Sequence, residues 1–155
     1  MPKEIKNQEL VMQINRPYKI YQPDDVFVKI PDDETQEIAD RKYLIDFRPT
    51  GIEFLDIFFQ IIKNHSRPSC KQIANKMQLD DYVLRHTIIA LTGMGIHDWI
   101  TTYMFLNSCE FLTRTKLPIT EIAKRTGFNS TSAFTQFFMR MQKLTPGDYR
   151  WSYRK

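Results

Sequence analysis

The sequence predicts an all-α protein in which two helix-turn-helix units are joined by one long helix. Apolar residues recur at helical spacing from Gly51 onward, and one helix-pair pattern occurs twice, about 50 residues apart. A chain of 155 residues is long enough for one such domain plus a short extension. We expect about seven helices, with residues 51–95 as the first unit, 96–114 as the linking helix and 115–155 as the second unit.

Residues 1–50 differ from the helical body and form a separate extension. Five prolines punctuate them, and the runs 26–30 and 43–47 have the composition of short strands. The sequence leaves open whether this extension is a small β-hairpin, an arm packed on the body or a partly disordered segment.

The first unit reads as three helices. An apolar i, i+3, i+4 stripe predicts a helix over 52–64. Ser69, with Gln72 three residues later, forms a capping box that starts the next helix. Asp80 is a good N-cap for the third helix, and Gly93 ends it.

The second unit carries the clearest pattern, over residues 117–138. A short helix ends at Gly127, which adopts a positive φ without a Cβ clash. Asn129 or Ser130 caps the next helix, which has phenylalanines on one face and polar residues on the other. A final helix begins at Thr145, with proline in its first position.

Several burial states follow from these helices. We expect Tyr149 and Trp151 to hold the last helix against the body while Arg150 stays exposed. Cys70 and Cys109 are too few for a disulfide framework, and both are expected to be buried thiols.

The polar face of the second unit indicates recognition of double-stranded DNA. A helix held by its apolar side that presents hydroxyl and amide groups fits the major groove. The candidate base-reading residues are Thr131, Ser132, Thr135 and Gln136 in the second unit and Tyr82, Arg85 and His86 in the first. The candidate phosphate-binding residues are Arg140, Lys143, Arg150, Lys124 and Arg125. For each single lysine or arginine, a surface charge without a partner is an equal alternative. For Tyr82, an aromatic side chain that packs on the start of its helix is an equal alternative, and for His86 a neutral, solvent-exposed side chain is slightly favoured.

The charge distribution supports a polyanionic partner. Residues 113–155 hold nine basic and two acidic side chains, a net charge of +7, whereas residues 1–50 and 51–112 have net charges of −2 and −1. A concentrated positive surface attracts nucleic acid, and the release of counterions makes such binding salt-dependent.

The linking helix has a length suited to holding two recognition helices, the readers, on one DNA duplex. About 18 residues at 1.5 Å per residue give a rod of about 27 Å. Recognition helices in successive major grooves lie about 34 Å apart. With the thickness of the helix pairs added, one chain can place two readers on one side of a duplex.

These residues resemble the DNA-binding domain of the AraC/XylS transcriptional regulators. The matching residues are Ile119, Ile122, Ala123, Gly127, Phe128, Ser130, Phe134, Phe138, Thr145, Pro146, Tyr149 and Arg150. The resemblance covers about residues 52–153 and is looser in the first unit. It implies an all-helical body and sequence-specific promoter binding. The family usually adds a ligand-binding or dimerising domain, for which 50 residues are too few.

The chain departs from the pattern of that family mainly in the first unit. Ile89 and Ala90 stand where basic residues are usual, and Met104 replaces a usual arginine of the long helix. The Asp80-Asp81 pair places negative charge where phosphates would approach. We therefore expect that the first unit binds DNA weakly or turns its apolar face to a protein partner.

In the second unit, two residues depart from the family. Lys143 replaces a usual glycine before the last helix, and Gln136 stands where arginine is common. Glutamine can read adenine through two hydrogen bonds or contact a phosphate.

Other classes of function find no support in the sequence. There is no glycine-rich phosphate loop, no metal-ligand spacing around the three histidines and no nucleophile paired with a base. We expect no enzymatic activity, no metal and no cofactor. The first six residues lack an apolar core for a signal peptide and no run spans a bilayer, so we expect a cytoplasmic protein.

The sequence thus predicts a transcription regulator that reads the major groove mainly through its second unit. The alternative is a protein-interaction module, a co-regulator or antirepressor, built on a degenerate DNA-binding fold. RNA polymerase or another regulator as a partner, and a homodimer formed through residues 1–50, are left open.

Overall fold

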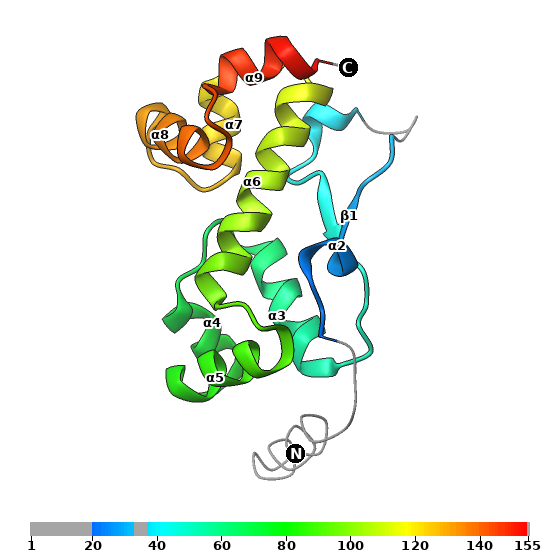
Figure 1. Cartoon of the computed structure of the whole chain (residues 1–155), viewed down its shortest axis with the longest axis vertical. Helices are drawn as coiled ribbons and strands as arrows, with labels where there is room; N and C mark the ends of the chain where they lie inside the picture. The colour runs from blue at the N-terminus through cyan, green and yellow to red at the C-terminus, as the bar shows by residue number, and fades with distance from the viewer. Residues whose placement is uncertain (1–19, 33–36, 155) are drawn as a thin grey trace.

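The helix α6 (Ile96–Arg114) forms the axis of the molecule, with one helical unit on each half of it (Figure 1). The computed structural model describes residues 20–32 and 37–154. The first six residues, on which the expectation about a signal peptide is based, lie outside this described part. Of the 19 residues of α6, 12 are buried. The helix has no single apolar stripe, because the two units and the N-terminal extension cover different sides of it.

The first unit consists of three helices, as predicted: α3 (Glu53–Asn64), α4 (Cys70–Met77) and α5 (Asp81–Thr92). The capping box is present. The backbone amide of Gln72 donates to Ser69 Oγ at 3.1 Å, and the backbone amide of Ser69 donates to the side-chain Oε1 of Gln72 at 2.8 Å. Asp80 is the N-cap of α5 without a side-chain capping bond, and Gly93 ends α5 at φ 74°.

The second unit also has its three helices: α7 (Ile119–Arg125), α8 (Thr131–Gln142) and α9 (Pro146–Tyr153). Ser130 rather than Asn129 caps α8, because its Oγ accepts from the Ala133 amide at 3.1 Å. Thr145 caps α9 in the same way, through the Asp148 amide at 3.1 Å.

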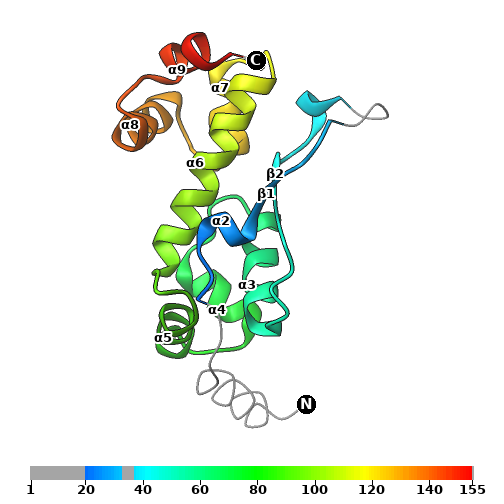
Figure 2. The same ribbon diagram turned by 45° about the vertical axis from the view of Figure 1, so that its right-hand side comes forward.

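The N-terminal extension is a small hairpin packed on the body. Its elements are α2 (Pro23–Val26), β1 (Phe27–Lys29), a 3₁₀ helix (Ile38–Asp40) and β2 (Ile45–Phe47). The strands pair antiparallel, with Phe27 opposite Phe47, and they lie beside α6 (Figure 2). Val26, Leu44 and Ile45 are buried, so the described part of residues 1–50 shares the core of the helical body.

An aromatic cluster joins the hairpin to the first unit and α6. Trp99 is fully buried, and its Nε1 donates to Thr92 Oγ1 at 2.9 Å. The Phe27 ring lies 5.7 Å from the Trp99 ring, and the Phe47 ring stacks on Phe59 at 4.9 Å. Such pairs add to the stability that comes from burial alone.

Two expectations about the last helix, α9, are wrong: the burial of Trp151 and the exposure of Arg150. Trp151 is 83% exposed, whereas Tyr149 is half-buried and packs on the Phe138 ring at 5.2 Å. Residues two apart on a helix lie on nearly opposite sides of it, so α9, which packs on the body by one side, turns Trp151 outward when Tyr149 turns inward. Arg150 is half-buried rather than exposed, because its Nε donates to the Leu112 carbonyl at 2.9 Å.

We expect Gly127→Ala to lower the free energy of unfolding by about 2 to 4 kcal/mol. Gly127 has φ 93°, and an added Cβ would lie 2.8 Å from Arg67 Cβ. Urea denaturation measures the change. Gly147→Ala is the matched control, since nothing lies within 4 Å of its added Cβ. Equal stability of the two variants would contradict this account of the turn.

Candidate nucleic-acid interface

The outer face of α8 carries polar side chains because its inner face is fixed by burial. Phe134 and Phe138 are fully buried and Phe137 is nearly so, which sets the rotation of the helix about its axis. On the outer face lie the four predicted base-reading residues of α8. Ser132 and Gln136 are exposed, whereas Thr131 and Thr135 are half-buried. None of these four side chains is enclosed in the core.

The three predicted base-reading residues of the first unit, Tyr82, Arg85 and His86, are all exposed on α5. The Tyr82 and His86 rings lie 4.0 Å apart, one helical turn from each other. A hydrogen bond with the Cys70 thiol and the nearby charge of Asp81 raise the pKa of Arg85 above its ordinary value. Cys70 is partly exposed, not buried as expected, whereas Cys109 is buried.

Helices α5 and α8 open onto one cleft of about 900 Å³, and α6 forms part of its lining. Arg85 and Ile89 line it from α5, and Gln136 and Arg140 line it from α8. Among the described residues that line the cleft, Arg67, Arg85 and Arg140 are cationic and there is no carboxylate. The cleft is therefore positively charged and lies between the two predicted readers.

The other predicted base-reading residues do not line this cleft: Tyr82, His86, Thr131, Ser132 and Thr135. Arg85 and Gln136 are thus the members of the predicted set that the fold brings to one shared concave surface.

Sequence reasoning did not assign five polar residues of the cleft to the site: Arg67, Ser69, Gln72, His97 and Thr101. The Arg67 guanidinium lies 5.2 Å from the Phe128 ring, so a loop of the first unit contacts the turn of the second. Thr101 Oγ1 lies 3.4 Å from His97 Nε2 on the first turns of α6. These residues lie outside both predicted recognition helices, and the folding of the chain alone brings them together.

Three of the predicted phosphate-binding residues are exposed: Lys124, Arg140 and Lys143. Lys143 is the C-cap of α8 with φ 66°, in the left-handed conformation that favours glycine. Its backbone amide donates to the Met139 carbonyl at 2.9 Å, which closes the last turn of α8.

The other two predicted phosphate-binding residues, Arg125 and Arg150, are half-buried and bind groups of the protein itself. Arg125 Nη1 donates to the carbonyls of Ala39 and Arg41 in the hairpin. Arg150 donates to the Leu112 carbonyl, and burial lowers the pKa of its guanidinium. In this structure both side chains bind backbone carbonyls of their own chain, which restrains them from reaching outward.

Comparison with known proteins gives the family. A family model described as a helix-turn-helix domain matches residues 73–152, which is more than half of the chain. The chain belongs to the AraC-type helix-turn-helix family. This membership supports a DNA-binding transcription regulator.

Several solved structures share the fold of this AraC-type domain. The C-terminal domain of AraT, a response regulator from Geobacillus stearothermophilus, is 24% identical with a TM-score of 0.63, covering 66% of this chain and 88% of that one. The C-terminal domain of the two-component response regulator yesN from Fusobacterium nucleatum is 22% identical with a TM-score of 0.59, covering 62% and 96%.

The DNA-binding domain of AdpA, a global transcriptional factor solved in complex with a target DNA, is also similar. It is 22% identical with a TM-score of 0.59, and the match covers 64% of this chain and 91% of that one. No curated protein sequence matched the chain.

Among the described residues, no group of three or more His, Cys, Asp or Glu side chains is arranged to hold a metal ion. None of the described helices combines the length and apolar character needed to cross a bilayer. Met104, at a position where the family resemblance implied arginine, is buried and lines the cleft.

We expect Lys143→Gly to raise the free energy of unfolding by about 0.5 to 1 kcal/mol, because glycine removes the cost of the left-handed C-cap. Urea denaturation measures the gain. Lys143→Ala is the control: it removes the same charge but keeps the backbone strain, so it should give no gain. A similar gain in both variants would show that charge, not conformation, limits stability at this cap.

Proposed function

We propose that this chain binds double-stranded DNA sequence-specifically in the cytoplasm and reads the major groove mainly through α8. One observation supports this most directly: Arg85 of α5 lines the same cationic cleft as Gln136 and Arg140 of α8. A surface that combines a polar recognition helix with three arginines is complementary to the edge and backbone of a duplex.

We assign direct base readout to the polar face of α8. Thr131, Ser132, Thr135 and Gln136 carry hydroxyl and amide groups that match donors and acceptors of the base edges. Arg140 lies one turn beyond Gln136 and is exposed, so it is placed to contact the flanking phosphate.

We assign a weaker DNA contact to α5. Arg85 is exposed, charged and on the cleft, and it can bind guanine through two hydrogen bonds. Asp80 and Asp81 are exposed at the start of the same helix, where their carboxylates oppose an approaching phosphate. The two carboxylates of α5 oppose the single favourable contact of Arg85, and this supports α8 as the main reader.

The test is a selection of bound oligonucleotides from a random duplex library with the purified chain. We expect a common sequence to be enriched, and its affinity, measured by fluorescence anisotropy, to fall steeply with salt. Enrichment of no sequence, or an affinity independent of salt, would refute sequence-specific DNA binding.

Two substitutions should separate base readout from phosphate binding. Gln136→Ala should relax the preference at one or two positions of the selected site, at a cost of about 1 to 3 kcal/mol for the correct base. Arg140→Ala should weaken all sequences equally and reduce the salt slope by about 0.9. Anisotropy titrations at several salt concentrations measure both effects.

Matched controls for these substitutions lie away from the cleft. Gln60 on α3 and Arg48 after β2 are exposed and do not line it. Gln60→Ala and Arg48→Ala should leave the base preference and the salt slope unchanged. An effect of Gln60→Ala as large as that of Gln136→Ala would contradict the assignment of α8.

A second candidate function is a protein-interaction module, with RNA polymerase or another regulator as the partner. The exposed apolar side chains of α5 favour it: Tyr82 is 71% exposed and Ile89 is 51% exposed. Ile89→Glu discriminates between the two functions. A carboxylate on the cleft should lower DNA affinity if α5 faces DNA, and should leave it unchanged if α5 faces a protein.

Within the described part of the N-terminal extension, a homodimer formed by strand pairing would use the outer edge of β1 or β2. Each strand has three residues, and such short strands support little pairing by themselves. Sedimentation of the full chain without DNA tests this arrangement, and a monomer at micromolar concentration would exclude it.

A further inference from the structure

The separation of α5 and α8 depends on how the two units are held along α6. A single helix bends, so readers placed at its two ends need further contacts to keep a fixed distance. The contact of Arg67 with Phe128 is one such connection. The N-terminal hairpin provides another, and its contacts follow α6 into the second unit.

The base of the hairpin is fastened to the middle of α6. The buried Asn107 side chain accepts from two consecutive backbone amides, Leu44 at 2.8 Å and Ile45 at 2.9 Å. Tyr103 Oη donates to the Ile45 carbonyl at 2.8 Å. These hydrogen bonds fix the hairpin beside the first unit.

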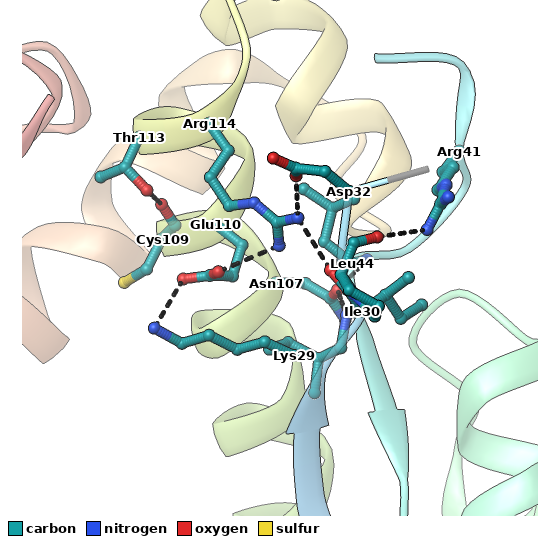
Figure 3. A network of polar contacts seen from close by, with 12 residues as sticks. Lys29, Ile30, Asp32, Arg41, Leu44, Asn107, Cys109, Glu110, Thr113 and Arg114 are labelled. Atoms are coloured by element: carbon teal, nitrogen blue, oxygen red, sulfur yellow. Dashed lines mark hydrogen bonds and ion pairs between the residues drawn. The ribbon is translucent and has the colours of Figure 1, made fainter. Parts of the chain in front are cut away.

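Farther along, Arg114 at the end of α6 binds the limb of the hairpin that contains β1 (Figure 3). Its Nη2 donates to the Ile30 carbonyl at 2.7 Å and to Asp32 Oδ1 at 2.8 Å. Its Nη1 donates to Glu110 Oε1 at 3.2 Å, and Glu110 Oε2 lies 3.6 Å from Lys29 Nζ. The side chains of Arg114 and Glu110 are only 12% and 8% exposed, so solvent screens this pair weakly, whereas the side chains of Asp32 and Lys29 are 80% and 64% exposed.

The last attachment comes from the second unit itself. Arg125 on α7 donates through Nη1 to the carbonyls of Ala39 and Arg41, and it pairs with Glu121 at 3.1 Å. Arg41 Nη1 in turn donates to the Pro31 carbonyl at 3.3 Å, which joins the two limbs. The hairpin thus bridges from the middle of α6 to the helix-turn-helix of the second unit.

We propose that Arg114 and Arg125 are positioning residues that fasten the hairpin across both units and so fix the separation of the two DNA-reading helices. This inference rests on the proposed DNA-binding function. It gives the extension a role in binding without contact to DNA: a fixed separation removes the cost of ordering the two units on a duplex.

The first experiment compares Arg125→Ala with the unchanged chain on two duplexes: the selected site for both readers, and a half-site for α8 alone. We expect at least a tenfold loss of affinity on the two-reader site and less than a twofold loss on the half-site. A library with varied spacers between the two half-sites should also show a broader spacing preference.

Lys124→Ala is the matched control, because Lys124 is adjacent on α7, exposed and of equal charge. Any phosphate contact of Lys124 should weaken both duplexes by the same factor and leave the spacing preference unchanged. Equal losses on both duplexes for Arg125→Ala, with an unchanged spacing preference, would overturn the positioning role.

The second experiment needs no DNA and therefore separates this inference from the proposed function. Residual dipolar couplings of the unchanged chain should fit one alignment tensor for α3–α5 and α7–α9, whereas those of Arg125→Ala should require two. Ile38→Ala, which loosens the same end of the hairpin without a charge change, should act likewise. A single tensor for both variants would overturn the inference, even if DNA binding itself fails.

Discussion

The burial of α6 on several sides is the constraint on which the rest of the structure depends. Each helix-turn-helix unit has only three helices of 7 to 12 residues, too few to enclose a core without help. α6 supplies Trp99 to the first unit and Phe111 and Leu112 toward the second, all fully buried. The units and the hairpin therefore form one continuous core, and the orientation of each recognition helix follows from its packing against this shared rod.

Most helix boundaries were predictable because they depend on local chemistry. The capping box at Ser69, the cap at Thr145 and the glycine stops at Gly93 and Gly127 are each decided by neighbours within a few residues. The place of the hairpin was not predictable, because it is decided by contacts such as Asn107 with Leu44, 63 residues apart. A sequence pattern describes the strands without giving the surface that they cover.

The candidate site was likewise predictable in part. Helical periodicity placed the outward residues of α8 correctly, since the buried face with Phe134 and Phe138 leaves one orientation for the rest. Individual cations were less predictable. Arg125 and Arg150 look like surface charges in the sequence, yet both bind distant backbone carbonyls. Arg67 entered the cleft from a loop, which no repeat or spacing indicated.

The long reach of the hairpin contacts has a consequence for synthesis of the chain. Arg114 binds a carbonyl that precedes it by 84 residues, and Arg125 binds two that precede it by 84 and 86 residues, so the hairpin is synthesised long before its anchors. Two three-residue strands do not persist alone in water, and contacts this distant in sequence form late. A nascent chain that stops before α6 thus lacks Tyr103, Asn107 and Arg114 and leaves the whole hairpin unfastened, and an unfastened segment of this kind is a preferred site of proteolysis.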